Sequence, residues 1–109
     1  MSIHQFLGQN TELLRNEIIS ELESDFTTLD FIKKFARKFE GEYINHLYYN
    51  RGNDAFNKVH SQIAKYLAEN EPLLDIRKKS KVKNMDVFGV MGEIQVWEKK
   101  KDFFKEFYY

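Results

Sequence analysis

Apolar residues in the first part of the chain recur at helical spacing. Leu14, Ile18 and Leu22 follow one another every four residues with acidic residues between them, which predicts an amphipathic helix over residues 11–23. Ahead of it, Ser2 and Gln5 have the spacing of a capping box, in which side chains and backbone N–H groups bond reciprocally. A short helical turn is therefore expected at the start of the chain.

A second helix is predicted to begin after Thr27. Thr27 and Asp30 again have capping-box spacing, and apolar side chains then repeat at helical intervals, namely Leu29, Ile32, Phe35, Ala36 and Phe39. Gly41 interrupts this pattern, and a glycine inside a helix costs about 1 kcal/mol relative to alanine. We expect a break or kink near residues 40–41, after which helical spacing resumes over residues 43–48.

A third helix is predicted over residues 54–70. Asp54 is a candidate N-cap, and one side of the helix is apolar through Phe56, Val59, Ile63, Tyr66 and Leu67. Pro72 is expected to end it, because proline disfavours helical backbone at the preceding residue.

Beyond Pro72 the pattern changes from helical spacing to alternation. Alternating residues over 74–83 and 94–97 predict two strands, joined by a turn in which Gly89 and Gly92 can take positive φ. On the first strand, one side is predicted to carry Leu74, Ile76, Lys78, Ser80 and Val82. The fold class is thus mainly α with a C-terminal β-ribbon, an α+β arrangement.

Composition bounds the kind of protein. A chain of 109 residues with 42% apolar and 16% aromatic residues is long enough for one domain with its own core, and too aromatic for disorder. Cysteine is absent, so no disulfide framework is available. No apolar run reaches the roughly 20 residues of a membrane span, and the first residues lack the features of a secretory signal. A cytoplasmic location without a membrane partner is expected.

The polar face of helix 54–70 is the first candidate site. Its side chains, spaced three and four apart, are types that bond base edges or phosphates: Asn57, Lys58, Ser61, Gln62 and Lys65. No acid occurs from Phe56 to Ala68, whereas solvated helix faces usually mix signs. An ordinary solvated face is the alternative.

The basic strand is the second candidate site. Five cations fall within residues 77–83, and four are predicted to alternate onto one face, namely Arg77, Lys79, Lys81 and Lys83. Such a face would line a phosphate backbone and add salt-sensitive affinity. The alternative is an edge strand protected from aggregation by lysines. The chain has no net charge, yet residues 1–50 carry −3 and residues 51–109 carry +3, and the local field decides the choice of partner.

Catalytic and metal-binding patterns are not found in the sequence. His4, His46 and His60 are far apart and no cysteine supports them, so a metal site is not expected. His60 follows the core residue Val59 and is expected to be a packed or interfacial side chain rather than a ligand. Neither a glycine-rich phosphate loop nor a nucleophile motif occurs. We expect a protein that is not an enzyme and has no cofactor.

The order of predicted elements over about residues 27–98 resembles the winged helix-turn-helix class. The resemblance implies a recognition helix at 54–70 in the major groove and a basic wing at 75–97 on the backbone or minor groove. Two departures are an extended first helix of the motif, with Gly41 and the extra segment 43–50, and a missing first strand. Helix 11–23 and residues 99–109 are then extensions of a single domain spanning 1–109.

These expectations combine into a small DNA-binding regulator acting on double-stranded DNA. A homodimer is expected through helix 11–23 or through the aromatic tail, which comprises Phe103, Phe104, Phe107, Tyr108 and Tyr109, although the tail could equally dock on its own core. The alternative function is a protein-interaction module, such as a phage or mobile-element inhibitor or adaptor. A structural RNA-binding protein is the third possibility.

Overall fold

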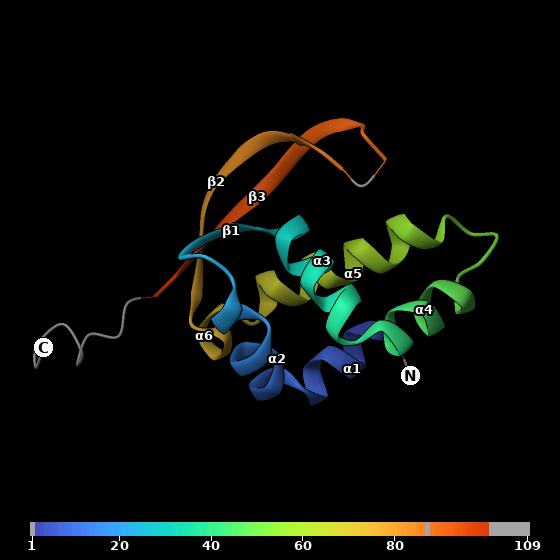
Figure 1. Cartoon of the computed structure of the whole chain (residues 1–109), viewed down its shortest axis with the longest axis horizontal. Helices are drawn as coiled ribbons and strands as arrows, with labels where there is room; N and C mark the ends of the chain where they lie inside the picture. Colours follow the sequence, from blue (N-terminus) through green and yellow to red (C-terminus); the bar gives the residue numbers. More distant parts are fainter. Residues whose placement is uncertain (1, 87, 101–109) are drawn as a thin grey trace, which may run out of the picture.

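The computed structural model describes residues 2–86 and 88–100. This part contains six α-helices, a 3₁₀ turn and a three-stranded antiparallel sheet (Figure 1), which confirms the α+β class. The helices are α1 (Ile3–Gln9), α2 (Thr11–Glu17), α3 (Thr28–Lys38), α4 (Glu40–Tyr49), α5 (Ala55–Glu69) and α6 (Glu71–Leu74). The 3₁₀ turn is η1 (Ile19–Glu21), and the strands are β1 (Asp25–Thr27), β2 (Ile76–Met85) and β3 (Met91–Lys99).

The first helices begin as their capping residues predict, but one helix ends early. Ser2 and Gln5 form the expected capping box at the start of α1. The single helix predicted over residues 11–23 is wrong, because α2 ends at Glu17 and the chain continues through η1. Ile18 and Ile19 are both buried, and the tighter turn brings both side chains into the core before the backbone becomes extended at Leu22.

The helix pair α3–α4 matches its prediction closely. Thr27 Oγ1 accepts the Asp30 N–H at 3.1 Å, and the Asp30 carboxylate accepts the Thr27 N–H at 2.9 Å. The expected break is confirmed, although the non-helical residue is Phe39, with φ −120° and ψ 47°, rather than Gly41. Phe39 packs against the core, and its ring lies 5.4 Å from that of Phe35.

Helix α5 has nearly the predicted length, but the residues at its two ends play other roles than expected. Asp54 makes no side-chain cap and instead takes left-handed backbone with φ 56°, a conformation that aspartate tolerates better than most residues. At the other end, α5 stops at Glu69 with Asn70 as its C-cap. Pro72 lies in the first turn of α6, where its missing N–H costs nothing. Leu74 accordingly belongs to α6 and not to a strand.

A short strand that the sequence pattern does not predict completes the sheet. β1 lies between η1 and α3 and pairs antiparallel with β3, giving the strand order β1-β3-β2. Phe26 pairs with Trp97, and both are buried. A strand of three residues with one buried side chain has too few positions for an alternating pattern, so the prediction that the first strand is missing is wrong.

The core lies between the helices and the base of the β2–β3 hairpin. Trp97 and Ile76 from the hairpin base pack with apolar residues of α1, α2, α3 and α5. The Trp97 indole N–H donates to Thr28 Oγ1 at 2.9 Å. The rest of the hairpin arches over α3 and α5 (Figure 1), and at its tip the Phe88 ring meets the Phe56 ring of α5 at 5.0 Å.

Candidate nucleic-acid interface

The predicted polar face of α5 exists as one surface. Asn57, Lys58, Ser61 and Lys65 are exposed and Gln62 is half-buried. The opposite side of the helix is fixed in the core through four fully buried residues, Val59, Ile63, Tyr66 and Leu67. Among the residues that the structure describes, no carboxylate lies within ion-pair distance of Lys58 or Lys65. Both ammonium groups are therefore available to an external anion.

One edge of α5 is held by His60. Its Nε2 lies 2.7 Å from the Tyr43 hydroxyl of α4, and the two rings stack at 5.9 Å. Burial lowers the pKa of His60 from its usual 6.5, and the Asp86 carboxylate of the hairpin offsets part of that effect. The lowered pKa favours the neutral imidazole, whose unprotonated Nε2 would accept a hydrogen bond from the Tyr43 hydroxyl. This agrees with the expectation that His60 is a packed side chain.

The cations of β2 do not share one face as predicted. Ile76 and Lys78 lie on the side of Trp97, because Lys78 is directly opposite Trp97 in the ladder. A bulge between Lys78 and Lys81 then shifts the alternation by one residue. Beyond the bulge, Lys81 lies opposite Gln95 and Lys83 lies opposite Glu93. Gln95 and Glu93 lie two and four residues before Trp97 on β3, so Lys81 and Lys83 are on the side of the ribbon that carries Trp97.

Arg77 and Lys79 lie on the opposite side of the hairpin and are paired with carboxylates. Arg77 Nη2 contacts Glu98 Oε1 at 2.8 Å, and Lys79 Nζ contacts Asp25 Oδ2 at 2.5 Å. Hydrogen bonds to these carboxylates raise the pKa of both cations. Exposed pairs of this kind add little stability, but they cancel charge locally. The prediction that Arg77, Lys79, Lys81 and Lys83 share one basic face is therefore wrong. Arg77 and Lys79 lie on the other side of the hairpin, where carboxylates neutralise them.

Lys81 and Lys83 remain as the exposed cations beyond the bulge. Neither has a carboxylate within ion-pair distance in the described ranges. Glu93 is the cross-strand neighbour of Lys83, whereas the neutral Gln95 is that of Lys81. Lys81 is therefore the less compensated of the two. Because β2 is an edge strand, long lysine side chains can extend past its edge toward solvent.

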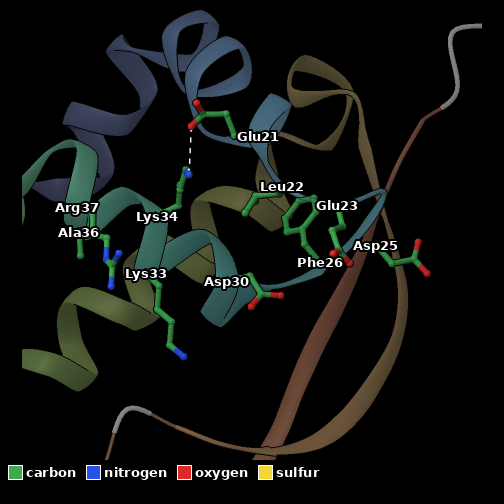
Figure 2. Close-up of a pocket in the computed structure, with 10 residues that line it drawn as sticks. All are labelled: Glu21, Leu22, Glu23, Asp25, Phe26, Asp30, Lys33, Lys34, Ala36 and Arg37. Atoms are coloured by element: carbon green, nitrogen blue, oxygen red, sulfur yellow. Dashed lines mark ion pairs between the residues drawn. The ribbon is translucent and has the colours of Figure 1, made fainter.

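A cleft of about 830 Å³ lies beside α3 (Figure 2). Its lining is mixed in charge and comprises Glu21, Leu22, Glu23, Asp25, Phe26, Asp30, Lys33, Lys34, Ala36 and Arg37. Three of its four carboxylates already have partners. Glu21 binds Lys34 at 3.3 Å and Lys38 at 2.7 Å, which lowers the pKa of Glu21. Asp25 binds Lys79, and the Asp30 carboxylate accepts the Thr27 N–H at the start of α3. Figure 2 shows Asp25 directed away from Lys33 and Arg37. The cleft offers no converging set of acid, base and nucleophile among the residues drawn.

Comparison with known proteins adds no relative. None of the protein-family models, curated proteins and solved structures matches this chain.

Within residues 2–86 and 88–100, no three His, Asp or Glu side chains gather in a way that could hold a metal ion. None of the described helices combines the length and the apolar character needed to cross a bilayer. The aromatic tail Phe103–Tyr109, proposed above as a dimer contact, lies outside the described residues.

Proposed function

We propose that this chain is a small non-enzymatic protein that binds double-stranded DNA and acts as a regulator. The observation that carries the proposal is the exposed face of α5, which is free of acids from Phe56 to Ala68 and is fixed from behind by the core. A helix of this width fits the major groove, where lysine can donate to guanine and glutamine can pair with adenine. Lys58, Ser61, Gln62 and Lys65 would make those contacts, with Asn57 beside them.

The arrangement of elements supports a winged helix-turn-helix mode of binding. A strand ahead of the helix pair is expected for that class, and β1 lies at that position. The hairpin follows α5 after only the short helix α6, and its tip contacts the first turn of α5 through Phe56. A duplex seated on the N-terminal half of α5 would therefore lie within reach of the hairpin. Lys81 and Lys83 would contact its phosphates, while Arg77 and Lys79 would keep their carboxylate partners.

Fluorescence anisotropy with a labelled duplex of about 25 base pairs, at several salt concentrations, tests the proposal. We expect salt-dependent binding, and weaker binding by the double variant Lys58→Ala, Lys65→Ala. The matched control is Lys33→Ala, Arg37→Ala, which removes two exposed cations from α3 and should bind like the wild type. An RNA duplex of the same sequence separates DNA binding from structural RNA binding. Absence of binding to either duplex at low salt would contradict the proposal.

One observation favours the second candidate function, a protein-interaction module. α4 exposes Ile44, Tyr48 and Tyr49, and the hairpin tip exposes further apolar residues. Clustered apolar side chains on a surface are typical of protein contacts. If no nucleic acid binds, or if the wild type self-associates and substitutions on α4 abolish that association, the interaction module becomes the better account.

A further inference from the structure

The tip of the β2–β3 hairpin exposes an unusual concentration of apolar side chains. Met85 is 54% exposed, Phe88 63%, Val90 62% and Met91 56%. We call these four residues the tip cluster. A single exposed apolar residue needs no explanation, but four within seven positions at the end of a projecting arm do. The β1 strand that supports the base of the hairpin pairs only with residues 96–98 of β3, so it does not reach the tip.

The turn that carries the tip cluster is tightly hydrogen-bonded. The Asp86 carboxylate accepts the N–H groups of Phe88 at 2.8 Å and of Val90 at 3.0 Å. The Asp86 N–H donates to the Val90 carbonyl at 2.9 Å, and Gly89 takes the positive φ of 77° that the turn requires. The turn therefore presents its apolar side chains from an ordered backbone, and the Asp86 charge is directed into the turn.

Helix α5 contacts the tip cluster at Phe88. The Phe88 and Phe56 rings meet edge to face, with centroids 5.0 Å apart and planes at 82°. This contact fixes one side of the Phe88 ring and leaves most of the side chain in solvent. It also keeps the tip beside the first turn of the helix that we propose enters the major groove.

Basic residues follow directly behind the apolar tip. Lys81 and Lys83 lie on the same side of the ribbon as Met85 and Met91, since Met85 and Met91 are cross-strand neighbours in the same alternation. Proteins that bind the minor groove combine basic residues with apolar side chains that insert between stacked base pairs. The lysines complement the charge of a nucleic-acid backbone, whereas a purely apolar protein partner would leave them without one.

From these features, and resting on the proposed function, we infer that the tip cluster is a wedge. It enters the minor groove of the bound duplex, with Phe88 and Val90 foremost, and inserts between adjacent base pairs. Known wedges of this kind kink duplexes by roughly 20–90° toward the major groove. Binding to this protein would thus bend DNA, and flexible pyrimidine–purine steps would be preferred at the site of insertion.

The test measures bending separately from binding. A 30-base-pair duplex labelled at both ends reports its end-to-end distance by energy transfer, and 2-aminopurine in its centre reports unstacking. The full-length chain is compared with Phe88→Ser, Val90→Ser. The control Ile44→Ser, Tyr48→Ser removes apolar side chains of similar exposure, 53% and 61%, from α4. Thermal unfolding of each variant confirms that it is folded.

We expect the wild type and the α4 variant to shorten the duplex and raise 2-aminopurine fluorescence at saturation. The tip variant should still bind with an unchanged salt dependence, but both bending signals should be lost. Saturated binding by the wild type without either signal overturns the wedge and leaves the proposed function intact. A wild-type protein that binds no duplex overturns both. If light scattering shows a wild-type dimer that the tip variant converts to a monomer, while bending is absent, the tip cluster is a self-association surface instead.

Discussion

Lys79 and Lys81 are two residues apart on β2, yet the structure predicts opposite consequences for removing them. The bulge places Lys81 on the side of Trp97, opposite the neutral Gln95. Lys79 lies on the other side with its ammonium 2.5 Å from the Asp25 carboxylate. A cation that already holds a carboxylate has little to gain from a phosphate. Lys81→Ala should therefore remove a DNA contact, and Lys79→Ala should not.

The size of the difference follows from counterion release. Each phosphate contact contributes about 0.9 to the slope of log K against log salt concentration. Between 50 and 200 mM salt, one contact accounts for a change of roughly threefold in affinity on this basis. The wild type and Lys79→Ala should lose affinity equally steeply over that range. Lys81→Ala should bind more weakly at low salt and lose about threefold less affinity as salt rises.

Anisotropy titrations of the three proteins with one duplex, at four or more salt concentrations, measure these slopes. Asp25→Asn provides a matched control, because it frees Lys79 on the outer side of the hairpin without changing Lys81 and should leave the slope unchanged. If Lys79→Ala flattens the slope as much as Lys81→Ala does, the outer side of the hairpin faces the DNA and the assignment of sides in the bound state is refuted. Equal slopes for all the proteins would show that the ribbon makes no contact with the DNA phosphates.

Three further predictions concern the fold. Thr28→Val removes the acceptor of the buried Trp97 N–H and should lower the free energy of unfolding by about 1–3 kcal/mol in chemical denaturation. Because burial lowers the pKa of His60, the unfolded chain binds the extra proton first, so stability should fall as pH drops below about 6.5, and His60→Gln should weaken this dependence. Gly89→Ala meets no neighbouring atom but forces alanine to a φ of 77°, so it should cost about 1–2 kcal/mol in the stability of the tip turn, measured by amide exchange.

Local signals in the sequence predicted the local structure well. The capping boxes at Ser2 and Thr27 set two helix starts, and the spacing of Val59, Ile63, Tyr66 and Leu67 predicted the buried side of α5, whereas Phe56 is exposed. These features depend on residues within a few positions of one another. The polar face of α5 followed directly, because a helix fixes which side chains lie together once its buried side is known.

The errors in the sheet and in the charges of β2 arose where distant residues decide the outcome. β1 is a strand only because Phe26 meets Trp97, which lies more than 70 positions later in the chain. The position of a β-bulge depends on two strands fitting a shared core and leaves no mark in the alternation of one strand. Asp25 neutralises Lys79 across a separation of 54 residues. Charge along β2 was visible in the sequence, but its division between two sides and its partial cancellation were not.

The bulge also divides the hairpin into two parts with different tasks. On the base side, the ladder with β1, the buried Trp97 and the pairs Arg77–Glu98 and Lys79–Asp25 tie the ribbon to the helices and use its charges internally. On the tip side, β1 no longer pairs, so in the described part of the chain the ribbon has two open edges. Lys81 and Lys83, which have no carboxylate within ion-pair distance in the described ranges, lie on that open part together with the exposed tip cluster. Whatever this ribbon binds should therefore contact it beyond the bulge, and substitutions before the bulge should change stability rather than affinity.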